Sequence, residues 1–386
     1  MERIQDKWLE RNARAEARLK RVFDFTNTEP GVVIVDCNYW TFGDLPEEIP
    51  DDHYTNPASA FKYQTEKIER HFHQLPDDDY IPFLHPWYGT GVLASAFGVK
   101  LVCNPKADPA VDLSTMTALE EIDDLVLPVP GEAGAMKRVT DYLDYFKAHA
   151  DLPVGITDCQ GPLTTAFQIA GYDKFCFWMH DDPTRIHTLM EKVTEALIQW
   201  VRFQKERAGQ PLQGCCYPLS IKVPDGYGGV WLSDDDSVIM SSELYKEFVK
   251  PYNECVLKAF GGGCIHYCGQ STQNISNYVH TEGVRAIHNL NLDNISVAAA
   301  MRNALKDKGI VYMACDFAPS EQRMEAYYRE LERDMGGPEG LIIASYIAPA
   351  IALDKGRYEA VSRDRTDVAR RVFGLLKRGR GDRREK

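Results

Sequence analysis

The sequence predicts an α/β protein built as a single (β/α)₈ barrel of the TIM type. Eight short apolar runs alternate with helix-like segments along the 386 residues. Most of these runs are continuously apolar, which is typical of strands buried on both faces of a parallel sheet. A doubly wound open sheet is the second choice, and it is weakened because no G-x-G-x-x-G follows any of the runs. Eight such strands, each followed by a helix, favour the barrel.

The expected strands are the apolar runs bounded by glycine, proline or polar clusters. In chain order they are Gly31–Cys37, Lys100–Asn104, Val154–Cys159, Leu212–Tyr217, Cys264–Cys268, Val284–Asn289, Ile310–Cys315 and Leu341–Tyr346.

The clearest helix is predicted over Pro183–Ala208. Asp182 stands at its N-cap position, proline suits the first helical position, and Gly209 ends it. Two further helices are expected over Glu243–Phe260 and Arg323–Met335. We expect a helical extension over residues 1–25, the catalytic barrel over 26–376, and a basic flexible tail over 377–386.

Composition excludes several classes of protein. Apolar residues make up 44% and charged residues 26%, which excludes a disordered chain. The net charge is −13, and the tail over 377–386 carries +4, so the rest of the chain carries −17. Such a body disfavours nucleic acid and acidic membrane surfaces. No apolar run is long enough to span a bilayer and the first residues lack a secretory core, so we expect a cytoplasmic protein whose cysteines are thiols.

The strongest local signal for chemistry is the stretch FGGGCIHYCGQ over residues 260–270. His266 and Cys268 are two residues apart on an expected strand, so their side chains point to the same side. Zinc favours nitrogen and sulfur ligands, and a catalytic zinc uses three protein ligands and an open position. The alternative is a buried histidine bonded to the backbone beside a structural thiol.

This stretch resembles the uroporphyrinogen decarboxylase superfamily, and more closely its cobalamin-dependent methyltransferase branch, in which an H-x-C-G motif supplies two zinc ligands. Three other stretches resemble the same family, namely GPLTTAFQIA over 161–170, the helix with DDPTRIHTLM from 181, and WLSDDDSVIMSSELYKEFVKPY over 231–252. The resemblance spans about residues 10–375. It implies a (β/α)₈ barrel, a zinc ion, and a corrinoid that is supplied by a separate protein or as free cobalamin.

Two departures from the family stand out. Ser345 takes the place of a late cysteine or histidine ligand, and a neutral hydroxyl is a poor zinc ligand. Cys315, at the end of the preceding strand, is therefore the expected third ligand after His266 and Cys268. In addition, residues 23–61 contain no Lys or Arg and eight Asp or Glu. A tetrapyrrole with many carboxylates needs paired cations, so this segment would repel it.

Other polar and aromatic residues follow the expected strands and are expected at the barrel mouth, where turn, capping or packing roles are the alternatives. The expected catalytic residues are Asp36, Asn38, His85, Asp158, Asp236 and Ser345. The expected substrate-binding residues are Tyr39, Gln160, Tyr227, Trp231, His288 and Tyr346. The glycine-rich segment DGYGGVW, before the acidic run Asp234–Asp236, is interpreted as a mobile loop.

Three hypotheses for function remain open at this point. The first is a zinc-dependent methyltransferase that moves a methyl group between a corrinoid and a small substrate, a thiol by preference. The second is a metal-free carboxy-lyase, whose carboxylate-binding cations would be Lys222, Arg285 and Lys355. The third is a non-catalytic protein that binds a corrinoid or tetrapyrrole. A small-molecule substrate, a separate corrinoid protein and a possible homodimer complete the expected partners.

Overall fold

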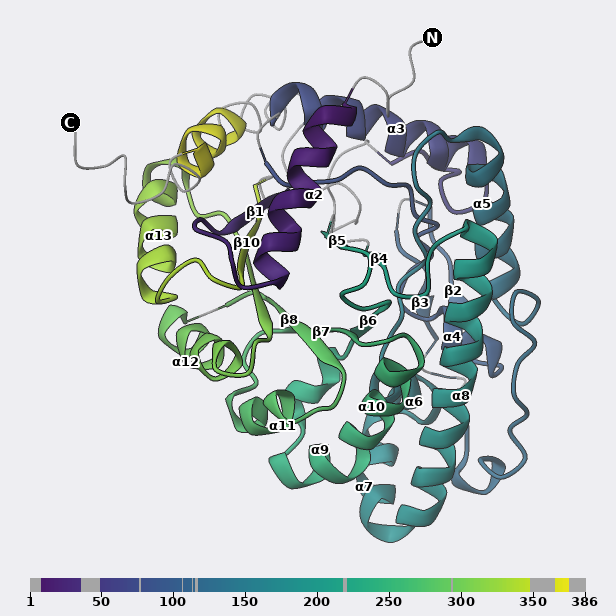
Figure 1. The fold of residues 1–386 in the computed structure, drawn as a ribbon. Helices are drawn as coiled ribbons and strands as arrows, with labels where there is room; N and C mark the ends of the chain where they lie inside the picture. Colours follow the sequence, from purple (N-terminus) through teal and green to yellow (C-terminus); the bar gives the residue numbers. More distant parts are fainter. Residues whose placement is uncertain are drawn as a thin grey trace, which may run out of the picture.

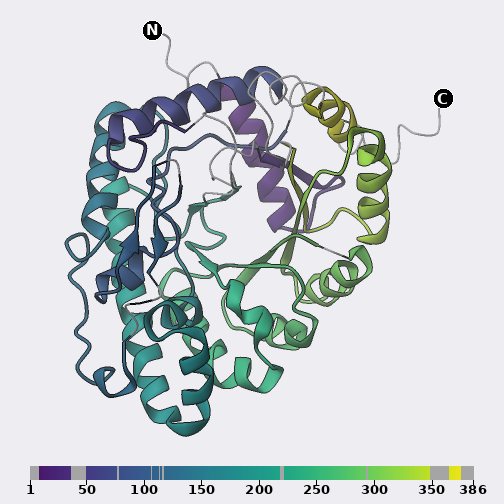
Figure 2. The same ribbon diagram turned by 180° about the vertical axis from the view of Figure 1, so that it is seen from behind.

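The fold is seen in a computed structural model in which a ring of helices surrounds a central set of strands (Figures 1 and 2). The structure describes residues 8–35, 49–75, 78–105, 107–112, 114, 117–217, 221–292, 294–347 and 365–374.

A six-stranded parallel sheet forms the centre of the fold. Its strand order is β1-β10-β9-β8-β7-β6, so successive strands from β6 to β10 are neighbours and the first strand pairs with the last. The strands are β1 (Gly31–Val35), β6 (Val230–Ser233), β7 (Gly263–Cys268), β8 (Val284–Leu290), β9 (Val311–Phe317) and β10 (Leu341–Tyr346).

Two irregular segments connect the outer edges of this sheet. Residues 78–84 reach β1 through the backbone hydrogen bond from Asp79 N to Val32 O, which is 2.6 Å long. The same segment forms a parallel bridge from Leu84 to Val154. The second segment runs from Val154 to Gln160, and it forms a parallel bridge from Gln160 to Ser233 of β6. These contacts complete a circuit of eight strand positions among the described residues. The predicted (β/α)₈ fold is confirmed, and all eight positions direct their carboxyl ends to one mouth.

Helices cover the outside of the circuit (Figure 2). The α-helices are α2 (Leu9–Phe23), α3 (Pro57–Gln74), α4 (Val92–Ala96), α5 (Met136–His149), α6 (Pro162–Ala170), α7 (Tyr172–Asp181), α8 (Pro183–Ala208), α9 (Ser242–Phe248), α10 (Lys250–Ala259), α11 (Ile275–Val279), α12 (Ile295–Lys306) and α13 (Glu321–Asp334). The short 3₁₀ helices are η1 (Leu119–Glu121), η2 (Asp235–Ile239) and η3 (Thr272–Asn274).

Helix α8 has the bounds that the sequence predicts. The Asp182 carboxylate accepts a hydrogen bond from Arg185 N, and Gly209 ends the helix in the left-handed conformation with φ 72°. The predicted helix over 243–260 is instead two helices, α9 and α10, which separate at Val249. Pro251 explains the break, because its ring lacks an N–H and clashes with the preceding turn of a continuous helix.

Two of the predicted barrel strands lie elsewhere. Within 100–104, β2 (Leu101–Val102) pairs antiparallel with β3 (Ala110–Val111); within 212–217, β4 (Cys215–Tyr217) pairs antiparallel with β5 (Ile221–Val223). Val102 is largely exposed, so the first run is not buried on both faces as a barrel strand must be. In the second run Cys215 and Cys216 are buried, but β4 pairs antiparallel with β5 and is not part of the parallel sheet. The last two residues of the segment interpreted as a mobile loop, Val230 and Trp231, belong to β6, which is fully buried.

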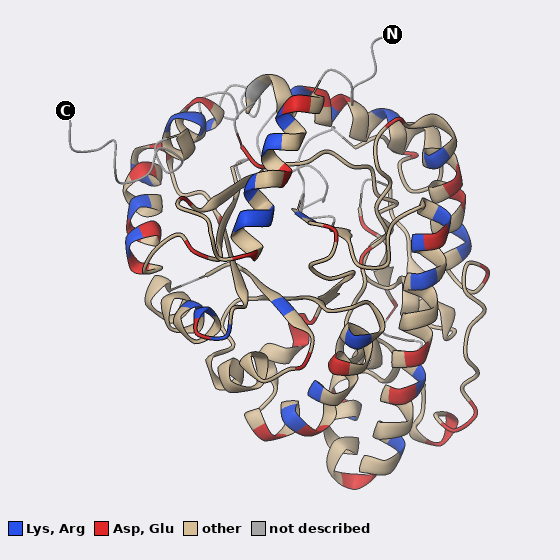
Figure 3. Ribbon diagram, viewed as in Figure 1, with Lys and Arg blue, Asp and Glu red and all other residues tan. Residues whose placement is uncertain are grey.

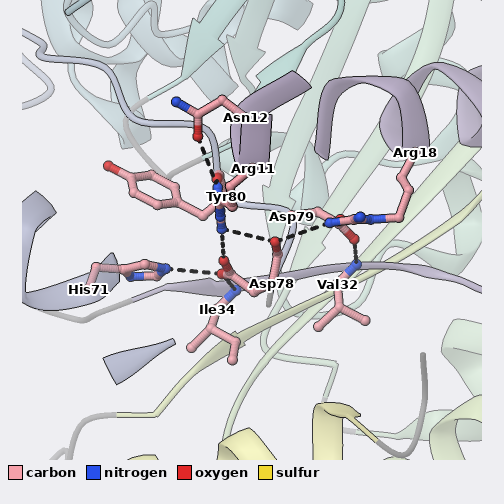
Figure 4. Close-up of polar contacts among 9 residues, drawn as sticks. All are labelled: Arg11, Asn12, Arg18, Val32, Ile34, His71, Asp78, Asp79 and Tyr80. Carbon is pink, nitrogen blue, oxygen red and sulfur yellow. Dashed lines mark hydrogen bonds and ion pairs between the residues drawn. The ribbon is translucent and has the colours of Figure 1, made fainter. Parts of the chain in front are cut away.

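Ion pairs join helix α2 to residues 78–84, which lie beside β1 (Figure 4). Arg11 pairs with Asp78, and Arg18 pairs with Asp79. The two aspartates in turn accept hydrogen bonds from the β1 backbone, at Ile34 N and Val32 N. Burial alone would raise the pKa of Asp78, but the charges and hydrogen bonds of His71 and Arg11 outweigh it and lower that pKa.

Charged side chains lie mostly along the outer helices, while the central strands are largely uncharged (Figure 3). None of the described helices is both long enough and apolar enough to cross a membrane.

Candidate metal centre

The H-x-C motif lies on β7, and a glycine at the start of this strand lets it pair closely with β6. Helix α10 ends at Ala259, and glycines follow before the strand. A Cβ atom on Gly263 would lie 2.2 Å from Val230 O, so only glycine permits this close pairing of β7 with β6. The strand then places His266, which is buried, and Cys268, its last residue, on one side.

Three donor atoms meet at this end of β7. His266 Nε2 lies 3.6 Å from Cys268 Sγ and 3.4 Å from Asp235 Oδ1. The donor atoms of Asp235, His266 and Cys268 all lie within 4.8 Å of one another. Among the described residues, one group of three or more histidine, cysteine and acidic side chains has the spacing of a metal site, and it is this one. A carboxylate oxygen, an imidazole nitrogen and a thiolate are all zinc ligands.

Asp235 reaches the motif because β6 and β7 are neighbours in the barrel. Ser233, the last residue of β6, pairs in register with His266. The next residue, Asp234, donates its backbone N–H to His266 O at 2.8 Å, and η2 begins at Asp235. The turn from β6 into η2 therefore brings Asp235 to the end of β7.

The three aspartates of the acidic run have different surroundings. Asp234 is buried and accepts a hydrogen bond from Asn253 Nδ2 at 3.0 Å, and burial raises its pKa to about 7. Asp236, the predicted catalytic member, accepts a long hydrogen bond of 3.5 Å from Tyr172 of α7. Burial also raises the pKa of Asp236. The sequence predicts Asp236 as the catalytic residue of this run, whereas in the structure Asp235 is the member beside His266.

The ionisation of Cys268 depends on its neighbours. The residue is exposed at the end of the strand, while its sulfur faces His266 and Asp235. Loss of water around the thiol, followed by the charge of Asp235, raises the pKa of Cys268. Without a cation the thiol is therefore neutral at physiological pH, and a bound metal reverses this preference because it favours the thiolate.

His288 lies behind His266 on the neighbouring strand. The two residues pair in register, and their Nδ1 atoms are 2.7 Å apart. The Trp231 ring packs against both, with its centroid 5.1 Å from that of His288 and 6.3 Å from that of His266. Burial and the adjacent His266 lower the pKa of His288. The structure thus brings together three residues that sequence reasoning assigned separately to metal and substrate binding.

Asp158 and Gln160 form a second polar group on the same side of the barrel. Ser233 Oγ donates a hydrogen bond to Asp158 Oδ1 at 2.8 Å, and Gln160 Nε2 donates to Asp158 Oδ2. Ser233 pairs with Gln160 on one side and with His266 on the other. This pairing places Asp158 two strand positions from β7, with β6 between them.

The residues predicted on β9 and β10 are arranged differently. Cys315 is buried and is not a member of the donor group of Asp235, His266 and Cys268. Its strand is separated from β7 by β8, about 9–10 Å across two strand spacings. Ser345 forms a hydrogen bond with Tyr328 of α13, so its hydroxyl points to the helix layer. Tyr346, one residue later, stacks on Phe317 with ring centroids 5.1 Å apart.

The remaining predicted site residues are not joined to this centre by the contacts described above. The backbone of His85 exchanges two hydrogen bonds with the side-chain amide of Gln64. Burial lowers the pKa of His85 to about 3, so its ring is neutral. Tyr227 donates a hydrogen bond of 2.7 Å to Asp24 beside α2, away from the donor group. Asp36, Asn38 and Tyr39 lie outside the described residues.

Comparison with known proteins identifies relatives of two kinds. Residues 86–215 match the family model "Uroporphyrinogen decarboxylase (URO-D)". A uroporphyrinogen decarboxylase of Hydrogenobaculum sp. is 24% identical over 174 residues, which is 44% of this chain and 43% of that protein. A methylated-thiol–coenzyme M methyltransferase of Methanosarcina mazei is 24% identical over 205 residues, which is 52% of this chain and 50% of that protein.

These matched segments span about half of each curated relative. Among solved structures, a methyltransferase from Methanosarcina mazei has the same fold, with a TM-score of 0.67 at 15% identity over 94% of this chain and 99% of that one. The chain is therefore similar to a uroporphyrinogen decarboxylase and to a methyltransferase, as the motifs predict.

Proposed function

We propose that this protein is a zinc-dependent methyltransferase that moves a methyl group between a corrinoid and a small thiol. The observation that carries the proposal is the meeting of Asp235, His266 and Cys268 at the barrel mouth, with donor atoms within 4.8 Å of one another. The similarity to a methylated-thiol–coenzyme M methyltransferase supports the thiol as the methyl acceptor or donor.

The donor set fits a catalytic zinc. One carboxylate, one imidazole and one thiolate give three protein ligands, which leaves a fourth position for substrate. When bound, zinc would lower the pKa of a substrate thiol and favour its thiolate, the nucleophile in alkyl transfer. The side chain of Asp235 is 37% exposed, so the centre is open to a substrate that enters from the mouth.

The chain's own residues orient the substrate around this centre. Trp231 packs beneath His266 and His288 and excludes water from the interior side. The Asp158 carboxylate is held by Ser233 and Gln160 and lines the same mouth on the β6 side. We propose that these two sides bind the non-reacting part of the substrate, and that a separate corrinoid protein or free cobalamin approaches from the open end.

The carboxy-lyase hypothesis has less support at the mouth. Lys222 Nζ lies 3.6 Å from Glu16 Oε2 of α2, and Arg285 is the second residue of β8, at the end of the strand opposite the mouth. Lys355 lies outside the described residues. The two predicted cations that the structure describes, Lys222 and Arg285, thus supply no carboxylate-binding charge beside His266.

The test is transfer of a methyl group from methylcobalamin to 2-mercaptoethanesulfonate or another small thiol, followed by the change in corrinoid absorbance. We expect the zinc-loaded protein to catalyse the transfer, and Cys268→Ala to reduce it to the uncatalysed rate. Cys176→Ala, a partly buried cysteine of α7, is the matched control and should keep the wild-type rate. No transfer with any thiol, or full activity of Cys268→Ala, would contradict the proposal.

A further inference from the structure

His266 and His288 face each other through the same type of ring nitrogen. Their Nδ1 atoms are 2.7 Å apart, and both residues are buried, at 3% and 0% exposure. They come from adjacent parallel strands and pair in register, so the backbone fixes the distance between them. A contact of this length is a hydrogen bond, because two nitrogen lone pairs without a proton between them repel each other.

We propose that His288 is a positioning residue that fixes the tautomer and ring orientation of His266. The inference rests on the proposed metal centre, since it concerns the nitrogen of His266 that faces Asp235 and Cys268. His288 itself does not touch the metal or the substrate in this account.

The placement of protons follows from the donor set. A neutral imidazole carries one N–H, and its other nitrogen is the lone-pair donor. His266 Nε2 faces Cys268 Sγ and Asp235 Oδ1, so for ligation this nitrogen must be the one without a proton. The proton of His266 then resides on Nδ1 and is donated to His288 Nδ1. His288 consequently carries its own proton on Nε2. Metal-binding histidines commonly have such an outer hydrogen bond, usually to an oxygen.

The packing around His288 supports a fixed acceptor. Its Nε2 has no hydrogen-bond partner among the described residues, so the bond to His266 is the directional contact that sets the ring angle. Trp231 packs against His288 with ring centroids 5.1 Å apart, and Met313 of β9 pairs with His288 in register. His288 is fully buried, and this packing leaves its ring little freedom to turn.

The experiment compares two substitutions at one position. In His288→Asn the amide oxygen stands two bonds from Cβ, as Nδ1 does, so an acceptor for His266 is kept. In His288→Leu the acceptor is lost while the volume stays similar. Zinc affinity is measured by competition with a chromogenic chelator. We expect His288→Leu to bind zinc about 10–100-fold more weakly than wild type, and His288→Asn to recover most of that loss.

Two further measurements separate positioning from damage to the fold. Ile287→Ala removes buried volume from the same strand at a residue that pairs with Ile265 and not with His266. We expect this control to lower thermal stability without weakening zinc binding. The cobalt(II)-substituted protein gives a second readout, because a turned His266 ring changes the absorption bands of the metal; His288→Leu should alter them and His288→Asn should not.

The outcomes distinguish the two proposals. If wild-type protein binds no zinc, the metal centre fails and this inference fails with it. If wild-type protein binds zinc through Cys268 but His288→Leu binds it equally tightly with unchanged cobalt spectra, only the positioning role is overturned. Equal weakening by His288→Leu and Ile287→Ala would likewise assign the effect to packing and overturn it.

Discussion

Asp235 Oδ1 lies 3.4 Å from His266 Nε2, although the two residues belong to different strand ends of the barrel. Asp235 follows β6 and His266 lies on β7, and the parallel pairing of these strands brings the two side chains together. We therefore propose that the carboxylate, and not Cys315, is the third ligand. A carboxylate oxygen of Asp235 as third ligand, in place of the Cys315 sulfur, has two testable consequences.

Asp235→Asn is expected to weaken zinc binding strongly, by a factor of ten or more, because an amide oxygen lacks the negative charge of a carboxylate ligand. Asp236→Asn is the matched control, since its carboxylate contacts Tyr172 and is not a member of the donor group. Both affinities are measured by chelator competition. Equal zinc affinities for wild type and Asp235→Asn would exclude Asp235 as a ligand.

Cys268→Ala and Cys315→Ala form a second matched pair. We expect the first to lose bound zinc and the second to keep it, because the Cys315 thiol is buried on β9 and is not a member of the donor group. Metal content is measured by atomic emission after dialysis against a weak chelator. Loss of zinc in Cys315→Ala, with retention in Cys268→Ala, would restore the ligand set predicted from the sequence.

Ser345→Ala tests where the serine hydroxyl acts. Ser345 is hydrogen-bonded to Tyr328 inside the layer between β10 and α13, so its loss leaves a buried phenol without that partner. We expect a loss of about 1–3 kcal/mol in the free energy of unfolding, with zinc content unchanged. The double variant Ser345→Ala/Tyr328→Phe should recover part of that loss. Normal stability combined with loss of zinc or of methyl transfer would instead place Ser345 in the site.

The lowered pKa of His53 should make the stability of the protein depend on pH. Burial and then the charge of Lys67 lower the pKa of His53 to about 4 from 6.5. As pH falls through this window, the unfolded chain takes up a proton that the folded protein excludes, so stability falls toward acid and is fully present above pH 6.5. The contribution is about 3 kcal/mol in total.

Urea unfolding of wild type and His53→Gln at pH 7 and at pH 4.5 checks this linkage. Other buried histidines act in the same direction, so the wild-type protein loses more stability than His53 alone explains. The variant should lose about 2–3 kcal/mol less than wild type between the two pH values. Parallel losses in the two proteins would show that His53 does not carry the effect.

Much of the fold could be predicted because local signals were strong. The helix α8 has proline at its first position, an aspartate cap and a terminal glycine, and its observed bounds agree with the sequence. The strand before β7 was harder to recognise: β6 has four residues and follows glycines that resemble a loop. Residues 78–84 contain two aspartates and a proline, and their backbone contacts to β1 and Val154 depend on tertiary packing.

Part of the candidate site could be predicted because its signal is local in the sequence. The spacing of His266 and Cys268 on one strand is a local property, and the structure places them as expected. Asp235 comes from a neighbouring strand end, so its place depends on register between strands, which a single sequence does not show. The orientation of Ser345 shows the same limit, since one residue along a strand separates the interior from the helix layer.

The central claim is tested most directly by a crystal structure of the zinc-loaded protein, with anomalous difference maps collected on both sides of the zinc absorption edge. The account predicts one strong peak that disappears below the edge and lies between Asp235 Oδ1, His266 Nε2 and Cys268 Sγ. A peak beside Cys315 without Asp235, or no zinc peak next to His266 in crystals grown with stoichiometric zinc, would contradict it.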